Sequence, residues 1–241
     1  MAALTLEAVN AYYGKAHIVR NVSFSLGSGE VVGIVGRNGV GKTTLLRSVM
    51  KLVPTVLGKV MLNGRDISTE ATDRRVRGGL GYMPQGMRVF SDLSVEENYR
   101  VSAYAVRAPM ALDDILSLVP EIKDLLKRPA GRLSGGQQQL VSLMRCLASN
   151  CSVLLMDEPT EGLMPKMVER IAEVASSLRE RGISIILVEQ NLALAEAVCD
   201  RGYIMEKGAI EAEGDFRSLR ESGEFERLLG LGHNSKEKEI R

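Results

Sequence analysis

Several residue types are scarce in this chain, and each scarcity narrows the class of protein. The 241 residues include no Trp, only 4% aromatic residues and three cysteines. Cys146, Cys151 and Cys199 form neither a Cys-x-x-Cys pair nor the even set that a disulfide framework requires. We therefore expect three buried thiols in a reducing cytoplasm.

An excess of charge of either sign is also missing. The chain carries 31 basic and 30 acidic residues, a net charge of +1, which gives no basic surface for nucleic acid and no polybasic membrane anchor. No apolar run approaches the ~20 residues of a membrane-spanning helix, and the N-terminus lacks a signal-peptide pattern. The sequence predicts a soluble, cytoplasmic protein without a nucleic-acid partner. Its two histidines, His17 and His233, are expected to face solvent in an early loop and in the polar tail.

Apolar residues make up 45% of the chain, enough for a sizeable core. Short alternating runs in the first thirty residues predict antiparallel strands. The continuous apolar run at 31–36 predicts a strand covered on both faces, as in a parallel sheet. Similar runs at 79–85, 152–159 and 183–190 predict further strands of that sheet.

Helical patterns fill most of the remaining sequence. Residues 87–150 are mostly helical in pattern, and 165–182 predict one amphipathic helix. Residues 202–214 predict a hairpin that turns at Lys207 and Gly208. The resulting expectation is an α/β fold in which 1–241 form one domain. Its core takes in about 1–86 and 151–229, a helical insert takes in about 87–150, and 230–241 form a flexible tail.

A glycine-rich loop, "GRNGVGKTT", follows the first buried strand and precedes a helical segment. It satisfies G-x-x-x-x-G-K-[ST], in which glycines let backbone N–H groups surround phosphates. Lys42 would reach the β- and γ-phosphates, and the Thr43 hydroxyl would ligate Mg²⁺. Alternatively, this is only a glycine-rich turn, which both flanks disfavour. The predicted phosphate-binding residues are Gly36, Arg37, Asn38, Gly39, Gly41, Lys42, Thr43 and Thr44.

Two adjacent carboxylates, Asp157 and Glu158, end the strand "SVLLMDEP". Asp157 would hold Mg²⁺, and Glu158 would take a proton from attacking water, which is commonly worth ~10²–10⁴ in rate. By itself the pattern fits a strand end with solvated charges equally well. Beside the glycine-rich loop it predicts a nucleotide-hydrolysing site.

A second glycine-rich stretch, "LSGGQQQ", lies inside the helical insert. Ser134 is a good N-cap, and Gly135 and Gly136 would begin a helix with bare backbone N–H groups. Such a helix start is an anion site with no lysine of its own. The alternative is a serine and two glycines that merely cap a helix. The predicted nucleotide-contacting residues here are Ser134, Gly135, Gly136 and Gln137.

With these motifs in this order, the chain resembles the nucleotide-binding subunit of an ATP-binding cassette (ABC) transporter from about Leu4 to Leu229. The resemblance implies a P-loop NTPase fold with a RecA-like parallel-sheet core, an N-terminal antiparallel β subdomain and a helical insert. It also implies that two cassettes pack head to tail, each lending its LSGGQ segment to the ATP on the other's P-loop. ATP and Mg²⁺ are the implied cofactors.

Further roles follow from the resemblance, position by position. Tyr13 falls where the family stacks an aromatic ring on adenine, with Tyr12 the less favoured neighbour. Gln85 matches the loop that touches Mg²⁺ and the attacking water. Gln190 stands where the family usually has a histidine, so catalysis would depend on Glu158 as the base, with Gln190 and Gln85 orienting phosphate and water. The implied metal ligands are Thr43, Gln85 and Asp157.

The stretches "VEQN", "DEPTEGL" and "RVFSDLSVEEN" look like the subfamily that serves importers of branched-chain amino acids and of urea or short amides. Met164 departs from the aspartate that is common at its position. The implied partners are a second cassette, two permease subunits that contact Gln85 to Phe90 and the helical insert, and indirectly a solute-binding protein. The subunit would lie in the cytoplasm on the inner face of the membrane. The alternatives are a non-transport cassette and a P-loop kinase or GTPase. A GTPase lacks support because no guanine-reading N-K-x-D motif is present, and a kinase lacks support because LSGGQ has no place in kinases.

Overall fold

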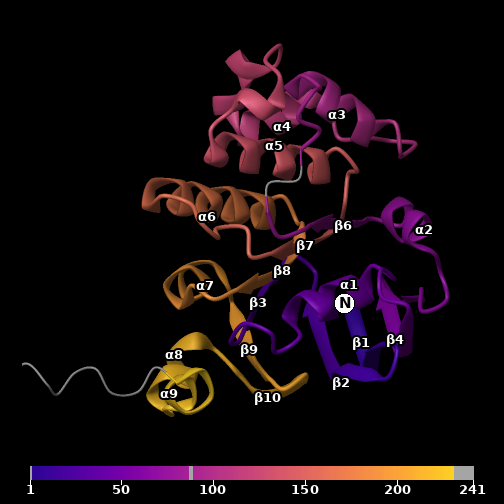
Figure 1. Ribbon diagram of the computed structural model, residues 1–241, viewed down its shortest axis with the longest axis vertical. Helices are drawn as coiled ribbons and strands as arrows, with labels where there is room; N and C mark the ends of the chain where they lie inside the picture. Colours follow the sequence, from indigo (N-terminus) through magenta and orange to yellow (C-terminus); the bar gives the residue numbers. More distant parts are fainter. Residues whose placement is uncertain (1, 87–88, 231–241) are drawn as a thin grey trace, which may run out of the picture.

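The structure, a computed structural model, describes residues 2–86 and 89–230 and contains two sheets (Figure 1). The first has the strand order β2-β1-β4-β5, and its paired strands are antiparallel. Alternation of apolar and polar residues lets one face of this sheet pack on the core while the other meets solvent. Its strands are β1 (Ala2–Tyr13), β2 (Ala16–Gly27), β4 (Thr55–Leu62) and β5 (Arg65–Asp66).

The second sheet has the order β10-β9-β3-β8-β7-β6 and is parallel apart from the β9–β10 hairpin. All five residues of β3 are buried, because helices lie on one face and the antiparallel sheet lies on the other. The hairpin turns at Lys207 and Gly208, as predicted. The strands are β3 (Val31–Val35), β6 (Leu80–Met83), β7 (Val153–Asp157), β8 (Ser184–Glu189), β9 (Arg201–Glu206) and β10 (Ala209–Gly214).

Between β6 and β7 the chain is helical, as the sequence predicted for 87–150, and Figure 1 shows this part gathered at one end of the molecule. A capping box formed by Ser94 and Glu97 begins the first helix. Within this segment, residues 112–125 form two helices rather than one, because Pro120 has no N–H to continue the first. The elements are α3 (Val95–Ala103), α4 (Leu112–Leu118), α5 (Gly135–Leu147) and the 3₁₀ helices Pro120–Leu125 and Ala130–Arg132.

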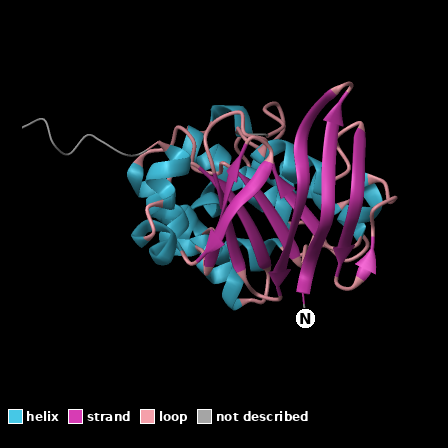
Figure 2. Cartoon of the chain, turned by 90° about the horizontal axis from the view of Figure 1, so that it is seen from below, coloured by secondary structure: helices cyan, strands magenta, loops and turns pink. Residues whose placement is uncertain are grey.

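The other helices cover the parallel sheet or its edges. The amphipathic pattern of 165–182 forms α6, which begins at Pro165 and buries Ile171, Ala175 and Leu178. Figure 2 shows the helices and the two groups of strands from below. No helix in the described ranges is long and apolar enough to span a membrane. The helices are α1 (Lys42–Val49), α2 (Thr72–Arg77), α6 (Pro165–Glu180), α7 (Leu192–Val198), α8 (Phe216–Glu221) and α9 (Glu224–Leu229).

Four expectations need correction. The sequence pattern did not predict β4, the third strand of the antiparallel sheet. The strand expected at 79–85 ends at Met83, because Pro84 cannot donate to the ladder. Only Cys151 is fully buried, whereas Cys146 and Cys199 are half-buried.

The fourth correction concerns His17, which the sequence assigned to a solvent-facing loop. The residue belongs to β2 and is half-buried. Its ring stacks on Tyr12, with ring centroids 4.2 Å apart, and its Nε2 lies 2.9 Å from Asn10 Oδ1. His233 and the predicted tail beyond Gly230 lie outside the described residues.

Candidate nucleotide site

The glycine-rich loop joins β3 to α1 and wraps around a lysine side chain. Lys42 Nζ donates hydrogen bonds to the carbonyl oxygens of Gly36 and Arg37, at 2.8 and 3.2 Å. Gly41 precedes the helix with a φ of 112°, and a Cβ there would lie 3.1 Å from the Ile18 carbonyl oxygen. No side chain caps α1 and no acidic residue lies in its first turn. The helix therefore presents an uncovered N-terminus to an anion.

Two adjoining cavities border this loop and share Asn38. The first, of about 270 Å³, is lined by loop residues together with Gln85 and Glu158. The second, of about 430 Å³, is lined by the start of the loop together with Gln190 and Leu229. The predicted phosphate-binding residues that line them are Gly36, Arg37, Asn38, Gly39, Gly41, Lys42, Thr43 and Thr44.

Asp157 ends β7 with its side chain fully buried beside the first turn of α1. The Thr43 hydroxyl donates to Asp157 Oδ1 at 3.0 Å, and the Tyr82 hydroxyl donates to Oδ2 at 3.0 Å. Burial raises the pKa of the Asp157 carboxyl above its ordinary value, against the effect of both hydrogen bonds. Sequence reasoning missed Tyr82, because only the pairing of its strand with β7 brings its hydroxyl to this carboxylate.

Glu158 is the point at which four distant parts of the sequence meet. Its Oε1 lies 3.3 Å from Lys42 Nζ, and both side chains are more than nine-tenths buried. Its Oε2 accepts hydrogen bonds from Gln85 Nε2 at 3.2 Å and from Gln190 Nε2 at 2.9 Å. Gln85 also donates to Glu161 at 2.9 Å. The structure thus brings together all three residues that the sequence proposed as catalytic.

The LSGGQ stretch opens α5 in the way its residue types predicted. The Ser134 hydroxyl accepts from Gln137 N at 3.4 Å, and Gln137 Oε1 accepts from Ser134 N at 3.0 Å, which completes a capping box. Gly136 packs closely against Met167: a Cβ there would lie 2.7 Å from Met167 Cε, so the Met167 side chain would have to shift. Of the described residues that line the two cavities, none belongs to Ser134–Gln137. Within one chain, the LSGGQ segment therefore does not line the two cavities that border the first glycine-rich loop.

The aromatic pair expected near adenine lies at the end of β1. Tyr13 is 39% exposed, and its side chain does not line either cavity among the described residues. Tyr12 is occupied by its stacking on His17, which leaves Tyr13 as the freer of the two rings.

The comparisons with known proteins agree with this geometry. Residues 19–161 match the family described as ABC transporter. The chain belongs to this family. Its cassette binds ATP and is an ATPase coupled to transport.

Three relatives have similar sequence identity to this chain. The probable branched-chain amino acid transport ATP-binding protein LivF of Archaeoglobus fulgidus is 37% identical over 91% of this chain and 95% of its own. The high-affinity branched-chain amino acid transport ATP-binding protein BraG of Pseudomonas aeruginosa is 35% identical over 86% of this chain and 90% of its own. The lipopolysaccharide export system ATP-binding protein LptB of Escherichia coli K12 is 34% identical over 89% of this chain and 91% of its own.

Solved cassettes share the fold of this one. The ATP-binding cassette MJ1267 of an ABC transporter has a TM-score of 0.85 at 26% identity and covers 95% of this chain and 99% of its own. A dimeric, post-hydrolysis state of the cassette MJ0796, bound to ADP and Pi, has a TM-score of 0.78 at 26% identity and covers 89% and 99%. These likenesses confirm the predicted α/β cassette fold.

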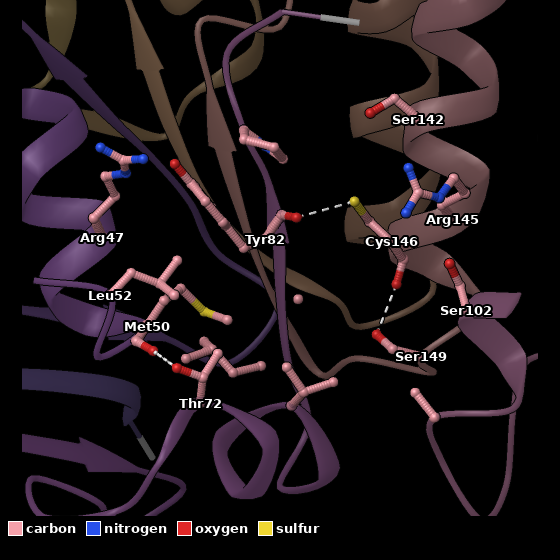
Figure 3. Close-up of a pocket in the computed structure, with 15 residues that line it drawn as sticks. Arg47, Met50, Leu52, Thr72, Tyr82, Ser102, Ser142, Arg145, Cys146 and Ser149 are labelled. Carbon is pink, nitrogen blue, oxygen red and sulfur yellow. Dashed lines mark hydrogen bonds between the residues drawn. The ribbon is translucent and has the colours of Figure 1, made fainter. Parts of the chain in front are cut away.

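The cassette has a further groove of about 600 Å³ between the parallel sheet and the helical segment (Figure 3). Arg47 and Met50 line one side, and Arg145 and Cys146 of α5 line the other. Tyr82 connects this groove to the nucleotide site, because its hydroxyl reaches Asp157 while its carbonyl accepts from the Cys146 thiol at 3.2 Å. Burial raises the pKa of Cys146 to about 12, so the thiol stays protonated and remains a donor.

Proposed function

We propose that the cassette hydrolyses ATP with Glu158 as the general base. The contact of Glu158 with Lys42, Gln85 and Gln190 is the observation that carries this proposal. A carboxylate can accept the proton of an attacking water, while the amides of Gln85 and Gln190 orient that water and the γ-phosphate. Gln190 is a neutral donor and never becomes cationic, so the positive charge at the phosphates comes from Lys42.

Magnesium fits the donor set beside the glycine-rich loop. Thr43 Oγ1 and Asp157 Oδ1 are 3.0 Å apart, and both are the oxygen ligands that Mg²⁺ prefers. Thr43, Asp157 and the amide oxygen of Gln85 would hold the ion. When bound, it would neutralise charge on the phosphates. Tyr82 would fix the second oxygen of Asp157 and so keep the first one turned toward α1.

A head-to-tail dimer would complete each nucleotide site. The N-terminus of α5 presents bare backbone N–H groups but does not line the cavities of its own chain. A second cassette would supply these groups to the phosphates held by Lys42, and Tyr13 would stack on the adenine. The dimeric state of the similar cassette MJ0796 supports a dimer.

The groove of Figure 3 is the proposed docking site for a permease subunit. Phe90, 43% exposed, lies near this region, with the Arg145 guanidinium 4.2 Å from its ring centroid. The buried amide of Asn98 fixes Phe90 by accepting from its N at 2.8 Å and donating to its carbonyl at 3.0 Å. Met87 and Arg88, also expected in this contact, lie outside the described residues. On this proposal, about 87–150 act as one helical unit, distinct from the core at about 1–86 and 151–229.

The proposed transport task is import of branched-chain or other hydrophobic amino acids, or of urea or short amides. The cassette would power this import from its place on the inner face of the membrane. The similarity to LivF and BraG supports amino acids. LptB, 34% identical, serves a different process, so identity by itself does not separate the two tasks. The partners would be two permease subunits, a second cassette and, indirectly, a solute-binding protein.

One variant tests the nucleotide chemistry and the dimer together. Glu158→Gln removes the base but keeps the shape of the side chain. We expect it to bind Mg-ATP, to hydrolyse it ~10²–10⁴-fold more slowly, and to elute as a dimer in size-exclusion chromatography with Mg-ATP but not with Mg-ADP. Parental hydrolysis would exclude Glu158 as the base, and a monomer under every condition would exclude the dimer. Uptake of labelled leucine and urea by cells lacking the gene, with and without the cassette, tests the solute.

A further inference from the structure

The backbone that carries Glu158 is strained. Its φ of 47° lies in the left-handed region, which non-glycine residues seldom adopt. Such a conformation is unfavourable and persists only where the surroundings hold it. Glu158 N donates to the Val188 carbonyl at 2.9 Å, and Leu163 N donates to the Thr160 carbonyl at 3.1 Å. Two buried side chains outside the nucleotide cavities also hold the 158–160 loop.

The first is Glu189, the last residue of β8, which is 3% exposed. Its Oε1 accepts from Thr160 N at 3.1 Å and from the Thr160 hydroxyl at 2.7 Å. Its Oε2 accepts from the backbone N of Gln190 at 3.2 Å and of Asn191 at 3.4 Å. All four contacts are donors, which suits an acceptor-only carboxylate. Glu189 therefore joins the loop of Glu158 to the loop of Gln190.

The second is Gln139, the last glutamine of "LSGGQQQ", which is 3% exposed on α5. Its Nε2 donates to the carbonyl oxygen of Pro159 at 2.5 Å. Pro159 directly follows Glu158, so this bond ties the LSGGQ helix to the backbone beside Glu158 of the same chain. Neither Gln139 nor Glu189 lines the cavities at the glycine-rich loop.

We propose that Gln139 and Glu189 are positioning residues that hold the 158–160 loop in its strained conformation and thereby set the position of the Glu158 carboxylate. Both act through Glu158 rather than on the nucleotide. Gln139 also connects the LSGGQ helix, through the Pro159 backbone, to the base of its own chain. The inference rests on the proposed role of Glu158 as the general base.

Two nearly isosteric variants test this. Glu189→Gln exchanges one acceptor oxygen for a donor, and Gln139→Met removes the donor. Because a misplacement of about 1 Å can cost on the order of 10²-fold in rate, we expect kcat to fall roughly 10- to 100-fold. Nucleotide affinity, measured with a fluorescent ATP analogue, should stay within about twofold of the parent, since only the rate-determining geometry changes.

Ser184→Ala is the matched control on the same strand. Ser184 is 1% exposed and accepts from Gly29 N at 2.9 Å, but it makes no contact with the 158–160 loop. Its loss should lower the melting temperature and leave kcat intact. Thr160 provides a second test if Glu189→Gln fails to fold, because Thr160→Val removes the hydroxyl donor whereas Thr160→Ser retains it. We expect Thr160→Val to lower kcat and Thr160→Ser to keep it near the parental value.

The deciding measurement repeats both variants in a Glu158→Gln background by single-turnover hydrolysis. If the two residues act through the carboxylate, they cause no further loss there. An undiminished further loss, or parental kcat in both single variants while Glu158→Gln is inactive, would overturn the inference and leave the proposed function standing. Parental kcat in Glu158→Gln would instead overturn the proposed function, and this inference with it.

Discussion

The ammonium of Lys42 lies 3.3 Å from the carboxylate of Glu158, and both side chains are almost wholly buried. The cation that would hold phosphate is thus paired with the carboxylate that would activate water. Arriving phosphates would compete with Glu158 for Lys42, and a released carboxylate is a better proton acceptor. On the proposed roles, nucleotide binding and activation of the base would be linked through this one ion pair.

This pairing predicts that Lys42→Ala does more than abolish nucleotide binding. It leaves the Glu158 charge buried without its counter-ion, and removal of one partner of a buried pair commonly costs about 3–5 kcal/mol. We expect a lower free energy of unfolding in denaturant titrations. The double variant Lys42→Ala/Glu158→Gln removes the stranded charge and should recover much of the loss. No recovery would show that Lys42 stabilises the fold mainly through its bonds to Gly36 and Arg37.

Ser134→Arg is expected to leave ATP binding intact and to prevent formation of the dimer. The arginine would place bulk and positive charge where the helix start of α5 meets the partner's nucleotide. Ser134→Ala is the control, because it removes the same cap, at a cost of about 1 kcal/mol, without adding bulk or charge. Analytical ultracentrifugation with Mg-ATP in a Glu158→Gln background measures the difference. Equal dimer fractions in the two variants would contradict the head-to-tail arrangement.

Asp157→Asn should stabilise the nucleotide-free protein at neutral pH. Burial raises the folded-state pKa of Asp157, so its protonated form is favoured in the native state. The parent is therefore most stable, with respect to this group, below the ordinary carboxyl pKa of about 3.9, and it loses that stability as the pH rises through the raised pKa. The asparagine does not titrate. The gain in melting temperature of Asp157→Asn over the parent should grow with pH. A gain that stays constant with pH would show that titration of Asp157 is not its cause.

Phe90→Asp is expected to weaken co-purification of the cassette with its permease by at least about tenfold. An acidic group in place of the ring would lose the apolar contact and the Arg145 stacking, and cation–π contacts contribute roughly 0.5–2 kcal/mol. The control is Leu57→Asp, which alters a side chain 55% exposed on β4 of the antiparallel sheet. Equal retention of the permease by both variants would place the docking site elsewhere.

The sequence predicted the core elements well where local chemistry leaves few options. The glycine-rich loop between a buried strand and a helix, the N-cap at Ser134 and the hairpin at Lys207 all follow from what glycine and short polar side chains permit. The third antiparallel strand was missed because Gly58 and Lys59 interrupt its alternation, and pairing with β1 overrides that weak pattern. His17 was misassigned because stacking on Tyr12 depends on strand register, which composition does not reveal.

Residue type and spacing determined that this chain is an α/β protein with a phosphate-binding loop, because few sequences can surround phosphates with backbone N–H groups. The resemblance carried by its motifs identified the cassette family, and the family match bears this out. Only the tertiary structure decided which distant groups meet. Glu158, Lys42 and Gln190 lie 32 to 148 positions apart, and Tyr82, Gln139 and Glu189 gave no local signal of function. The crossovers of the parallel sheet bring the carboxyl ends of β3, β6, β7 and β8 to one edge, and this long-range pairing fixes the site.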